Sequence, residues 1–525
     1  MAYTEVRNGK IRVRWKQANG KYNGGVSINE KTGEPFQTED EARQYGEDQE
    51  TLIRLGLRKD RSKIKFGEWA NTWYAGLALE PSTMRTYRSL LSGHLMPVFE
   101  ERYLDDLEDS EFDPWERSIV RAGYAPRTAR DARTLMINIL GDAVPRYIDA
   151  NPAARKRGKG KKGLRRIEAY QRAAKVWPSP GEAVLVAERA ALVADDWDVF
   201  LMYVTKAWTG LRWSEILALR PESLLDGDAL DVDTKIYELS GFYLGYPKDG
   251  SLRVIDVPPF LGLLLRAQAK RARTCTCTGR KGRPPVDGDE DVEWCVGGRR
   301  RYLFLTREGA HYGRGWSSAT MRPAADGVYP GREDKRWPRP PRPVLADTAV
   351  YGPSPARGRA QVLEGAYAWP GRPVHVPWPY AEPGVEFVPP RGRGRPDYAS
   401  WPEAERPHLV TWLPIRPGLT PHGFRHGHQT WMDDAGIKKA LKVERMGHED
   451  TSMSGRYGHV TEGMREQLRD VLQALWENAL AERFRLWPTS PVPILDAALA
   501  PWREGTARKI VSQISPRNSR RALTG

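Results

Sequence analysis

A proline-dense segment in the second half of the chain limits its folding more than any other feature. Residues 321–420 hold 20 of the 41 prolines, together with 13 arginines and one lysine, Lys335. Proline lacks the backbone donor and clashes with the preceding helical turn, so this density breaks both helices and strand ladders. We therefore expect about 321–415 to be an irregular or polyproline insertion inside a folded domain.

A second interruption is a run of basic residues between Arg155 and Arg166, "RKRGKGKKGLRR". Eight of these twelve residues are Lys or Arg, interleaved with Gly. Like charges repel and no apolar core can form, so the run is expected to be an extended linker that lies along a polyanion. The candidate phosphate contacts here are Arg155, Lys156, Arg157, Lys159, Lys161 and Lys162.

These two interruptions divide a chain that is long enough for several cores. It has 525 residues, 40% of them hydrophobic, which predicts two to four domains. We expect a mainly α protein with small β-sheets. The expected parts are a small β domain (1–50), a helical domain (64–153), the linker (154–180), a main domain (181–475) that carries the insertion, and a C-terminal tail (476–525).

The first 50 residues have the pattern of a small sheet followed by a helix. In "KIRVRWK", Ile11, Val13 and Trp15 alternate with basic residues, the period of a half-buried strand. An Asn-Gly turn follows in "ANGK", and Thr38 in "QTEDEAR" is placed to cap a helix. Basic side chains on a sheet face suit a DNA groove, although an ordinary solvated face has the same pattern. The candidates are Arg12 and Arg14.

Residues 64–150 have helical periodicity. Phe66, Trp69 and Trp73 form one apolar stripe, which predicts a core face. In "APRTARDARTLMINIL", three arginines share a helical face and could follow a row of phosphates, or form a solvated surface. They are Arg127, Arg130 and Arg133.

The charge favours a polyanionic partner. Lys plus Arg is 82 and Asp plus Glu is 67, which gives a net charge of +15 and a pI near 9.6. Nucleic acid is the first candidate, and a merely basic enzyme is the alternative. No run of about eighteen apolar residues exists, so no membrane span is expected. The N-terminal "MAYTEVRNGKIRVRW" has no apolar segment of the kind found in signal peptides.

The chain has three cysteines, Cys275, Cys277 and Cys295. A small odd number argues against a disulfide framework and fits a reducing cytoplasm. The three thiols could ligate zinc, with His311 as a fourth ligand. Their C-x-C spacing is not that of a standard zinc knuckle, so the sequence favours the alternative of no metal site.

Six polar residues stand in short motifs that offer no packing reason for them. Two arginines, one lysine, two histidines and one tyrosine suit phosphoryl transfer without a metal. Guanidiniums can bind the non-bridging oxygens of a phosphodiester, and a tyrosine hydroxyl can attack the phosphorus. A histidine can accept the proton, a lysine on a mobile β-turn can protonate the leaving 5′ oxygen, and the second histidine can donate to the phosphate. The six are Arg212, Lys248, His422, Arg425, His448 and Tyr457.

The motifs that hold these residues resemble the signature sequences of the tyrosine recombinases, the phage-type integrases. "TGLRWSEI", "PHGFRHGHQT", "MGH" and "YGHV" occur in the family's order, with 22 residues between Arg425 and His448 and 8 between His448 and Tyr457. The resemblance implies that Arg212 and Arg425 bind the phosphate and that Tyr457 is the nucleophile. It further assigns Glu215 a supporting role and places Lys248 on a β-hairpin. Lys206 and Lys235 lie nearby in the sequence and are alternatives for this lysine. The chain departs from the family between about 270 and 415, where the family has a far shorter connection.

The resemblance also implies the layout and the activity. The parts would be an arm-binding three-stranded sheet, a helical core-binding domain and a mixed α+β catalytic domain. The function would be site-specific integration or excision of a phage or mobile element through a 3′-phosphotyrosine, with neither metal nor ATP. Expected partners are double-stranded attachment sites, three further copies in a synaptic tetramer, and an excisionase or host DNA-bending factor. The expected location is the cytoplasm, at the nucleoid of a bacterial host.

Two other functions remain open at this point. A type IB topoisomerase has a similar catalytic group, although the N-terminal sheet and the spacing from "MGHED" to "YGHV" favour a recombinase. The other is a DNA-binding protein that kept the fold and lost catalysis. The presence of all six catalytic residue types argues against that loss.

Overall fold

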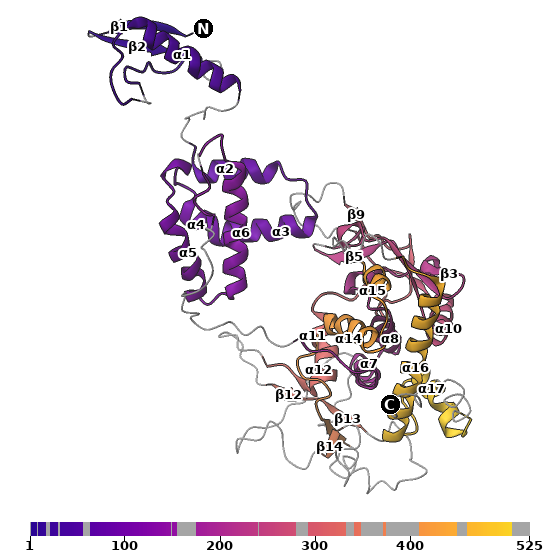
Figure 1. Ribbon diagram of the computed structural model, residues 1–525. Helices are drawn as coiled ribbons and strands as arrows, with labels where there is room; N and C mark the ends of the chain where they lie inside the picture. Colours follow the sequence, from indigo (N-terminus) through magenta and orange to yellow (C-terminus); the bar gives the residue numbers. More distant parts are fainter. Residues whose placement is uncertain are drawn as a thin grey trace, which may run out of the picture. The chain divides into compact units, whose positions relative to one another are not determined.

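The computed structural model describes most of the chain, in two compact units (Figure 1). The described residues up to 154 belong to one unit and those from 175 onward to the other. The described ranges are 2–7, 9–16, 22–29, 32–55, 64–148, 150–154, 175–239, 241–279, 292–331, 341–347, 371–373, 409–448 and 459–506.

The N-terminal part is a small sheet covered by a helix. Strands β1 (Tyr3–Arg7) and β2 (Lys10–Arg14) pair antiparallel, and a third segment joins β2 through the isolated bridge between Val13 and Val26. Helix α1 (Glu39–Arg54) begins at Thr38, whose hydroxyl accepts from the backbone N–H of Glu41 at 3.2 Å, as expected. Val13 and Trp15 are buried against α1, so the alternating pattern is confirmed. The expected third strand is present only as this bridged segment.

The helical domain from 64 to 153 surrounds one core. The apolar stripe that begins at Phe66 faces this core, with Phe66 buried and Trp69 and Trp73 half-buried. Phe99, Phe112 and Trp115 fill the centre. The elements are α2 (Phe66–Ala75), α3 (Pro81–Leu90), the π-helical turn η1 (Leu91–Leu95), α4 (Met96–Phe99), η2 (Leu104–Asp106), α5 (Asp109–Arg121) and α6 (Pro126–Asp142).

The second unit is built around helix α8 (Asp198–Thr209), in which every residue from Val199 to Thr209 is buried. Trp208 is at the centre, with its ring against Phe260, Trp431 and Trp476. The other long helices are α7 (Pro180–Ala194), α10 (Pro259–Lys270), α14 (Pro421–Asp434), α15 (Lys439–Met446), α16 (Glu462–Leu486) and α17 (Pro493–Arg503).

Two small antiparallel sheets adjoin these helices. One has the order β3 (Leu224–Leu225), β4 (Ala229–Val232), β7 (Arg253–Asp256), and the other β5 (Lys235–Glu238), β6 (Phe242–Gly245), β9 (Glu293–Trp294). A third pairing joins β8 (Arg273–Thr274) to β10 (Arg301–Tyr302). The expected fold class, mainly α with small β-sheets and a mixed α+β main domain, is confirmed. None of the described helices combines the length and apolar character that crossing a membrane requires.

The insertion starts later than the expected residue 321. Helices α11 (Trp316–Ala319) and α12 (Met321–Asp326) belong to the main core, where Met321 and Ala325 are buried. The described parts beyond α12 form two small sheets of their own rather than an irregular coil. One pairs β11 (Val328–Tyr329) with β12 (Arg342–Pro343), and the other has the order β13 (Leu345–Asp347), β15 (Leu409–Trp412), β14 (Gly371–Pro373).

The two ends of this insertion lie next to each other. The backbone N–H of Ile415 donates to Ala325 O at 2.8 Å, and Arg189 of α7 donates to Leu413 O at 2.7 Å. Gly327 has φ +72°, and a Cβ there would lie 2.2 Å from Trp412 O. A glycine is therefore required where the insertion leaves the core.

The expected boundary at 475 is wrong, because α16 runs through it from Glu462 to Leu486. Leu480, Leu495 and Leu499 belong to the main core, so the described part of the expected tail is part of the domain. A closed polar network fixes it there. Arg483 of α16 donates to both carboxylate oxygens of Glu188 on α7 at 2.7 and 2.8 Å, and both side chains are fully buried. Ser490 donates to the same carboxylate at 2.6 Å.

This network gives a stability prediction. Arg483→Met leaves the Glu188 carboxylate buried without its cation, so we expect a loss of about 3–5 kcal/mol in the free energy of unfolding. Adding Glu188→Met to that variant should recover more than half of the loss, because the stranded charge is removed. Arg503→Met is the matched control, since its ion pair with Asp496 is partly exposed and should cost less than about 1 kcal/mol. Urea unfolding followed by tryptophan fluorescence measures all four proteins. A double variant no more stable than Arg483→Met would contradict this account.

Candidate active site

The site begins where the buried helix α8 ends. Gly210 terminates α8 with φ +69°, and the chain turns directly into α9 (Trp213–Ala218). Arg212 occupies the N-cap position of α9, and its backbone N–H donates to the Glu215 carboxylate at 2.8 Å. This acidic residue therefore fixes the turn that presents the Arg212 side chain.

Glu215 is the anion that holds the arginines of the site. Its carboxylate accepts from Arg212 Nη1 at 2.8 Å and from Arg253 Nη2 at 2.8 Å, and only 1% of the residue is exposed. Burial alone would raise the pKa of Glu215. The hydrogen bond and charge of Arg253, together with Arg212, reverse this effect and lower the pKa to about 2. A pKa this low leaves Glu215 ionised at neutral pH, so that its negative charge faces both arginines.

The second arginine of the predicted set comes from α14. Arg425 is buried, with 3% exposure, and its guanidinium donates to Gly210 O at 2.8 Å and to Met446 O. Arg212 Nη2 donates to Gly447 O at 3.2 Å, across 235 residues of sequence. The two guanidiniums thus bind consecutive carbonyls at the C-terminus of α15, the end of a helix that attracts cations.

Glycine is required at both places where the backbone approaches these arginines. Gly447 has φ +58° and ends α15, and a Cβ there would lie 3.0 Å from Arg253 Nη1. A Cβ on Gly210 would lie 2.7 Å from the ring of His428. The "TGLR" and "MGH" motifs therefore carry glycine for steric reasons that follow from the site itself.

His448 follows Gly447 and is exposed beside Arg425. The distance from Arg425 Nη2 to His448 Nε2 is 3.1 Å. A guanidinium can only donate, so Nε2 accepts and the proton of the neutral ring is on Nδ1. Burial of part of the ring, and then the charges of Arg425 and Arg212, lower the pKa of His448.

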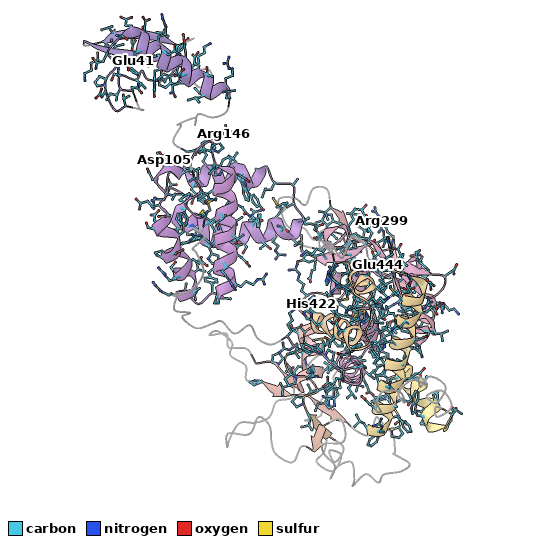
Figure 2. The ribbon with its side chains drawn as sticks, viewed as in Figure 1. Glu41, Asp105, Arg146, Arg299, His422 and Glu444 are labelled. Carbon is cyan, nitrogen blue, oxygen red and sulfur yellow. The ribbon has the colours of Figure 1, made fainter. Side chains whose placement is uncertain are left out.

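His422 lies in the first turn of α14, one helical turn before Arg425 (Figure 2). It is exposed at the surface, in contrast to Arg425. Partial desolvation, and then the charges of His426, Lys206, Arg425 and Arg212, lower the pKa of His422 to about 4. A neutral imidazole at pH 7 can accept a proton, which is one of the two histidine roles expected in phosphoryl transfer.

Lys206 is a member of the cluster that the sequence motifs do not single out. It lies on α8 with 1% exposure, and its ammonium donates to Leu211 O at 2.6 Å. Burial, and then the charge of Arg425, lower the pKa of Lys206 to about 7. The sequence does carry a signal for this residue, because Lys206 stands in the largely apolar run "FLMYVTKAWT". A helix built from such a run has no exposed face on which the ammonium could be solvated.

Lys248 does not lie on a hairpin. It begins a single 3-10 turn (Lys248–Gly250) between β6 and β7, and these strands belong to different sheets. Its side chain is exposed. The turn nevertheless borders the site, because Ser251 Oγ accepts from Arg212 Nη1 at 3.4 Å. The alternative Lys235 lies on β5.

Seven of the predicted residues are not among those that the structure describes. Tyr457 lies outside the described residues, and so do the six basic linker residues Arg155, Lys156, Arg157, Lys159, Lys161 and Lys162.

The candidate phosphate contacts of the first unit divide into two kinds. Arg127 and Arg130 are exposed on α6, and Arg127 lies 3.5 Å from Asp131. Arg133 is buried, donates to Ala153 O at 2.8 Å and stacks over the Phe112 ring, so it does not fit the expected phosphate contact. Arg14 pairs with Glu5 at 3.1 Å, and Arg12 lies opposite Glu5 in the sheet register.

The cluster holds more positive than negative charge. Among the described residues, Glu215 is the one carboxylate that accepts hydrogen bonds from this group of cations, which comprises Arg212, Arg253, Arg425 and Lys206. Backbone carbonyls satisfy their other donors but do not neutralise them. An anion at the exposed edge, where Arg212 and His448 reach solvent, would restore the balance. The geometry thus suits a phosphate group.

No protein-family model matches this sequence, and neither does the sequence of any curated protein. Solved structures of integrases do match. A Tn1549 transposon integrase in complex with transposon right end DNA has a TM-score of 0.43 and 16% identity, covering 77% of this chain and 98% of that chain. A lambda integrase dimer bound to a COC′ core site has a TM-score of 0.38 and 12% identity, over 87% and 96%. A lambda integrase tetramer on a Holliday junction has a TM-score of 0.40 and 12% identity, over 88% and 98%. Integrases are the class that the motifs of this chain resemble. With TM-scores below 0.5, the chemistry has to be inferred from the residues of this chain.

The buried lysine gives a pH prediction. The pKa of Lys206 is about 7 when folded, while an unfolded lysine has a pKa of about 10.4. Between these two pH values the unfolded chain binds a proton that the folded protein does not. The burial of Lys206 therefore lowers the free energy of unfolding most below pH 7, and this loss becomes smaller toward pH 10. The stability of Lys206→Met relative to wild type should therefore be highest at pH 7 and fall as the pH rises.

Urea unfolding at pH 7, 8.5 and 10 measures this difference. Lys270→Met is the control, because Lys270 is exposed on α10, and its difference from wild type should stay flat. A Lys206→Met difference that does not change with pH would show that the ammonium is not buried as described.

Proposed function

We propose that this protein is a tyrosine site-specific recombinase, an integrase that cleaves and rejoins DNA through a 3′-phosphotyrosine. The observation that carries the proposal is the meeting of Arg212 and Arg425 on the consecutive carbonyls of Met446 and Gly447, with His448 against Arg425. These residues come from three separate sequence motifs. Their convergence around a cationic edge is the arrangement that the motif resemblance implies.

The chemical roles follow from the groups present. The two guanidiniums would bind the non-bridging oxygens of the scissile phosphate and stabilise the charge that develops there. Burial, and then the charge of Arg212, lower the pKa of Arg425 to about 9, which leaves it charged at neutral pH. Glu215 and the helix end fix both side chains before the substrate arrives, so little reorganisation is needed.

The nucleophile in this proposal is Tyr457. Its hydroxyl oxygen would form the bond to phosphorus as its proton passes to neutral His422, and the bond from phosphorus to the 5′ oxygen would break. Lys248, on the turn that borders the site, would protonate the leaving 5′ oxygen, and the reverse sequence would rejoin strands. The phosphotyrosyl bond keeps the energy of the broken strand, so no ATP is needed. Tyr457 stands nine positions after His448. An extended chain spans about 3.3–3.6 Å per residue, so the connection allows this reach.

The remaining expectations follow from this function. We propose double-stranded attachment sites of a phage or mobile element as substrate and a tetramer as the synaptic assembly, with an excisionase or DNA-bending protein as an accessory factor. The integrases of similar structure were solved with transposon DNA, with a core site and, as a tetramer, with a Holliday junction. The basic linker and the exposed Arg127 and Arg130 would supply sequence-independent phosphate contacts. The chemistry itself is proposed to need no metal.

The nucleophile is the sharpest test. Tyr457→Phe should bind a nicked suicide substrate with wild-type affinity and form no covalent adduct, because only the attacking oxygen is removed. Denaturing gel electrophoresis of the labelled strand measures the adduct, and a mobility shift measures binding. Tyr124→Phe, an exposed tyrosine of the first unit, is the control and should form the adduct.

Each alternative function has its own outcome. An adduct in Tyr457→Phe would refute the assignment of the nucleophile. Binding without an adduct in wild type would identify an inert DNA-binding protein. Relaxation of supercoiled plasmid without any specific site would favour the topoisomerase.

The insertion gives a second prediction. Because Ala325 and Ile415 are hydrogen-bonded, residues 330–408 can be replaced by a short Gly/Ser linker at little closure cost. We expect this variant to form the covalent adduct at near wild-type rates, while complete recombination between two sites falls at least tenfold, since the insertion would act between subunits. A folded deletion variant, as judged by circular dichroism, that forms no adduct would place the insertion in the active site. Undiminished recombination would leave the insertion without a role in synapsis.

A further inference from the structure

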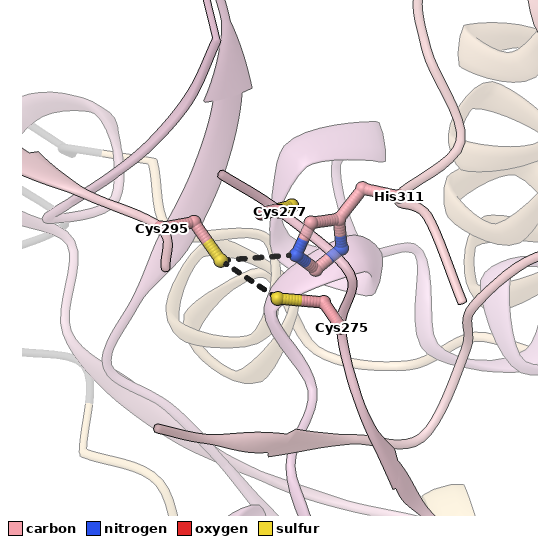
Figure 3. A group of neighbouring side chains, drawn as sticks. All are labelled: Cys275, Cys277, Cys295 and His311. Atoms are coloured by element: carbon pink, nitrogen blue, oxygen red, sulfur yellow. Dashed lines mark hydrogen bonds between the residues drawn. The ribbon is translucent and has the colours of Figure 1, made fainter. Parts of the chain in front are cut away.

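All three cysteines of the chain meet one histidine in the second unit. The ligand atoms of Cys275, Cys277, Cys295 and His311 lie within 4.8 Å of one another (Figure 3). Cys295 Sγ is 3.3 Å from Cys275 Sγ and 3.3 Å from His311 Nε2. Three of the four residues are buried, and Cys277 is half-buried.

The four residues come from three segments that the backbone holds in place. Cys275 and Cys277 follow β8, Cys295 follows β9, and His311 follows the tight turn around Gly309. The backbone N–H of Cys295 donates to Phe242 O at 2.8 Å, which continues the pairing of β9 with β6. The N–H of Thr276 donates to Gly309 O at 2.8 Å. Backbone hydrogen bonds therefore hold each of the three segments that carry the candidate metal ligands.

Gly297 shows how closely these segments pack. Its N–H donates to Cys277 O at 2.6 Å, and a Cβ at this position would lie 2.6 Å from Cys275 O. A side chain here would push the Cys295 segment away from the other two cysteines. The "CVGG" sequence therefore has glycine where the thiols have to converge.

The imidazole is aimed into the cluster. Only 3% of His311 is exposed, and its ring lies edge-on between Tyr302 and Phe242, at 4.6 and 5.1 Å between centroids. Nε2 faces Cys295, while Nδ1 is buried and has no hydrogen-bond partner among the described residues. Tyr302 OH is 3.4 Å from Cys295 Sγ and can donate to a thiolate there. Thiols are weak hydrogen-bonding groups, so they alone give little reason to bury an imidazole among them.

We propose that these four residues bind one Zn²⁺ ion in a closed tetrahedral Cys₃His site. Tetrahedral zinc has bonds of about 2.3 Å to sulfur and 2.0–2.1 Å to nitrogen, which places the ligand atoms about 3.6–3.8 Å apart. The distances here, from 3.3 to at most 4.8 Å, surround those values, so small side-chain adjustments admit the ion. Four protein ligands leave no open position, which makes the site structural. The sequence favoured no metal because C-x-C is an unusual local spacing, but ligand geometry is set in space.

The ion would have a defined mechanical role. The cluster lies in the stretch from about 270 onward where the chain departs from the recombinase pattern, and it joins that stretch to the edge of the β5–β6–β9 sheet. Strand β6 leads within three residues to the turn that begins at Lys248. Zinc would hold the added segment against the sheet from which that turn emerges. The ion takes no part in the proposed cleavage reaction.

Metal content of the full-length protein tests the proposal. Protein purified without chelator should contain one zinc per chain by elemental mass spectrometry, and X-ray absorption should show three sulfur ligands and one nitrogen. Cobalt exchanged into the site should give the intense visible bands of tetrahedral thiolate coordination. Cys295→Ser and His311→Gln should each lower the zinc content at least fivefold and lower the unfolding temperature. His459→Gln, an exposed histidine, is the matched control and should keep its zinc.

A second measurement covers variants that fail to fold. Wild-type protein unfolded with a chelator and refolded with zinc should regain its unfolding temperature, and refolding without zinc should not. Folded wild-type protein that carries no zinc, binds neither zinc nor cobalt and shows three freely titrating thiols would overturn the proposal. A Cys275–Cys295 disulfide in protein purified under reducing conditions would overturn it as well. Because these measurements involve no DNA, their failure is distinct from a failure of the proposed cleavage reaction.

Discussion

The buried carboxylate of Glu215 is the interaction on which the cationic site depends. It accepts hydrogen bonds from Arg212 and Arg253. Burial lowers the pKa of Lys206 and of Arg425, and the charge of Glu215 acts against this lowering. Burying several cations around one anion is costly, and the protein offsets part of the cost with carbonyls at the end of α15. Arg212, whose side chain is 21% exposed, brings part of this positive charge to the exposed edge beside His448. A site that is incompletely neutralised when empty gains more from binding a phosphate than one already balanced by carboxylates.

The fold and the site are built from the same helix ends. Helix α8 ends at Gly210, α15 ends at Gly447, and α14 carries Arg425 between them, so the carbonyls of Gly210, Met446 and Gly447 all accept from the two predicted arginines. Local sequence sets each end, because glycine alone tolerates the positive φ and the close contacts there. Packing of α8 at the centre of the unit then fixes the distances. The core therefore determines how accurately the groups proposed to bind phosphate are positioned.

Sequence patterns correctly predicted the features that depend on residues close together in the chain. The Thr38 cap, the buried Val13 and Trp15, and the fold class are confirmed, and the motifs brought Arg212, Arg425, His448 and Glu215 to one place. The failures concern properties that only packing decides. Arg133 has the helical spacing of its exposed neighbours but is buried over Phe112, and α16 continues through an expected boundary because its apolar face belongs to the main core. Lys206 is equally invisible to motif spacing, since its importance arises from total burial beside Arg425.

The cysteine cluster is another case in which sequence spacing alone is a poor guide, because the spacing favoured no metal site. The spacing rule applies to zinc knuckles, in which one short turn carries two ligands. Here the candidate ligands come from three separate places: the segments after β8 and β9, and the turn at Gly309. The segment that departs from the recombinase pattern is thus joined to the β6 strand, whose other end leads to the Lys248 turn. An addition to such a domain is tolerated when its anchor lies away from the groups proposed to react. The thiols and imidazole meet this condition, because among the described residues no hydrogen bond or ion pair joins them to Arg212, Arg425 or His448. Cys275 and Cys295 are themselves packed in the main core, which holds the added segment in place.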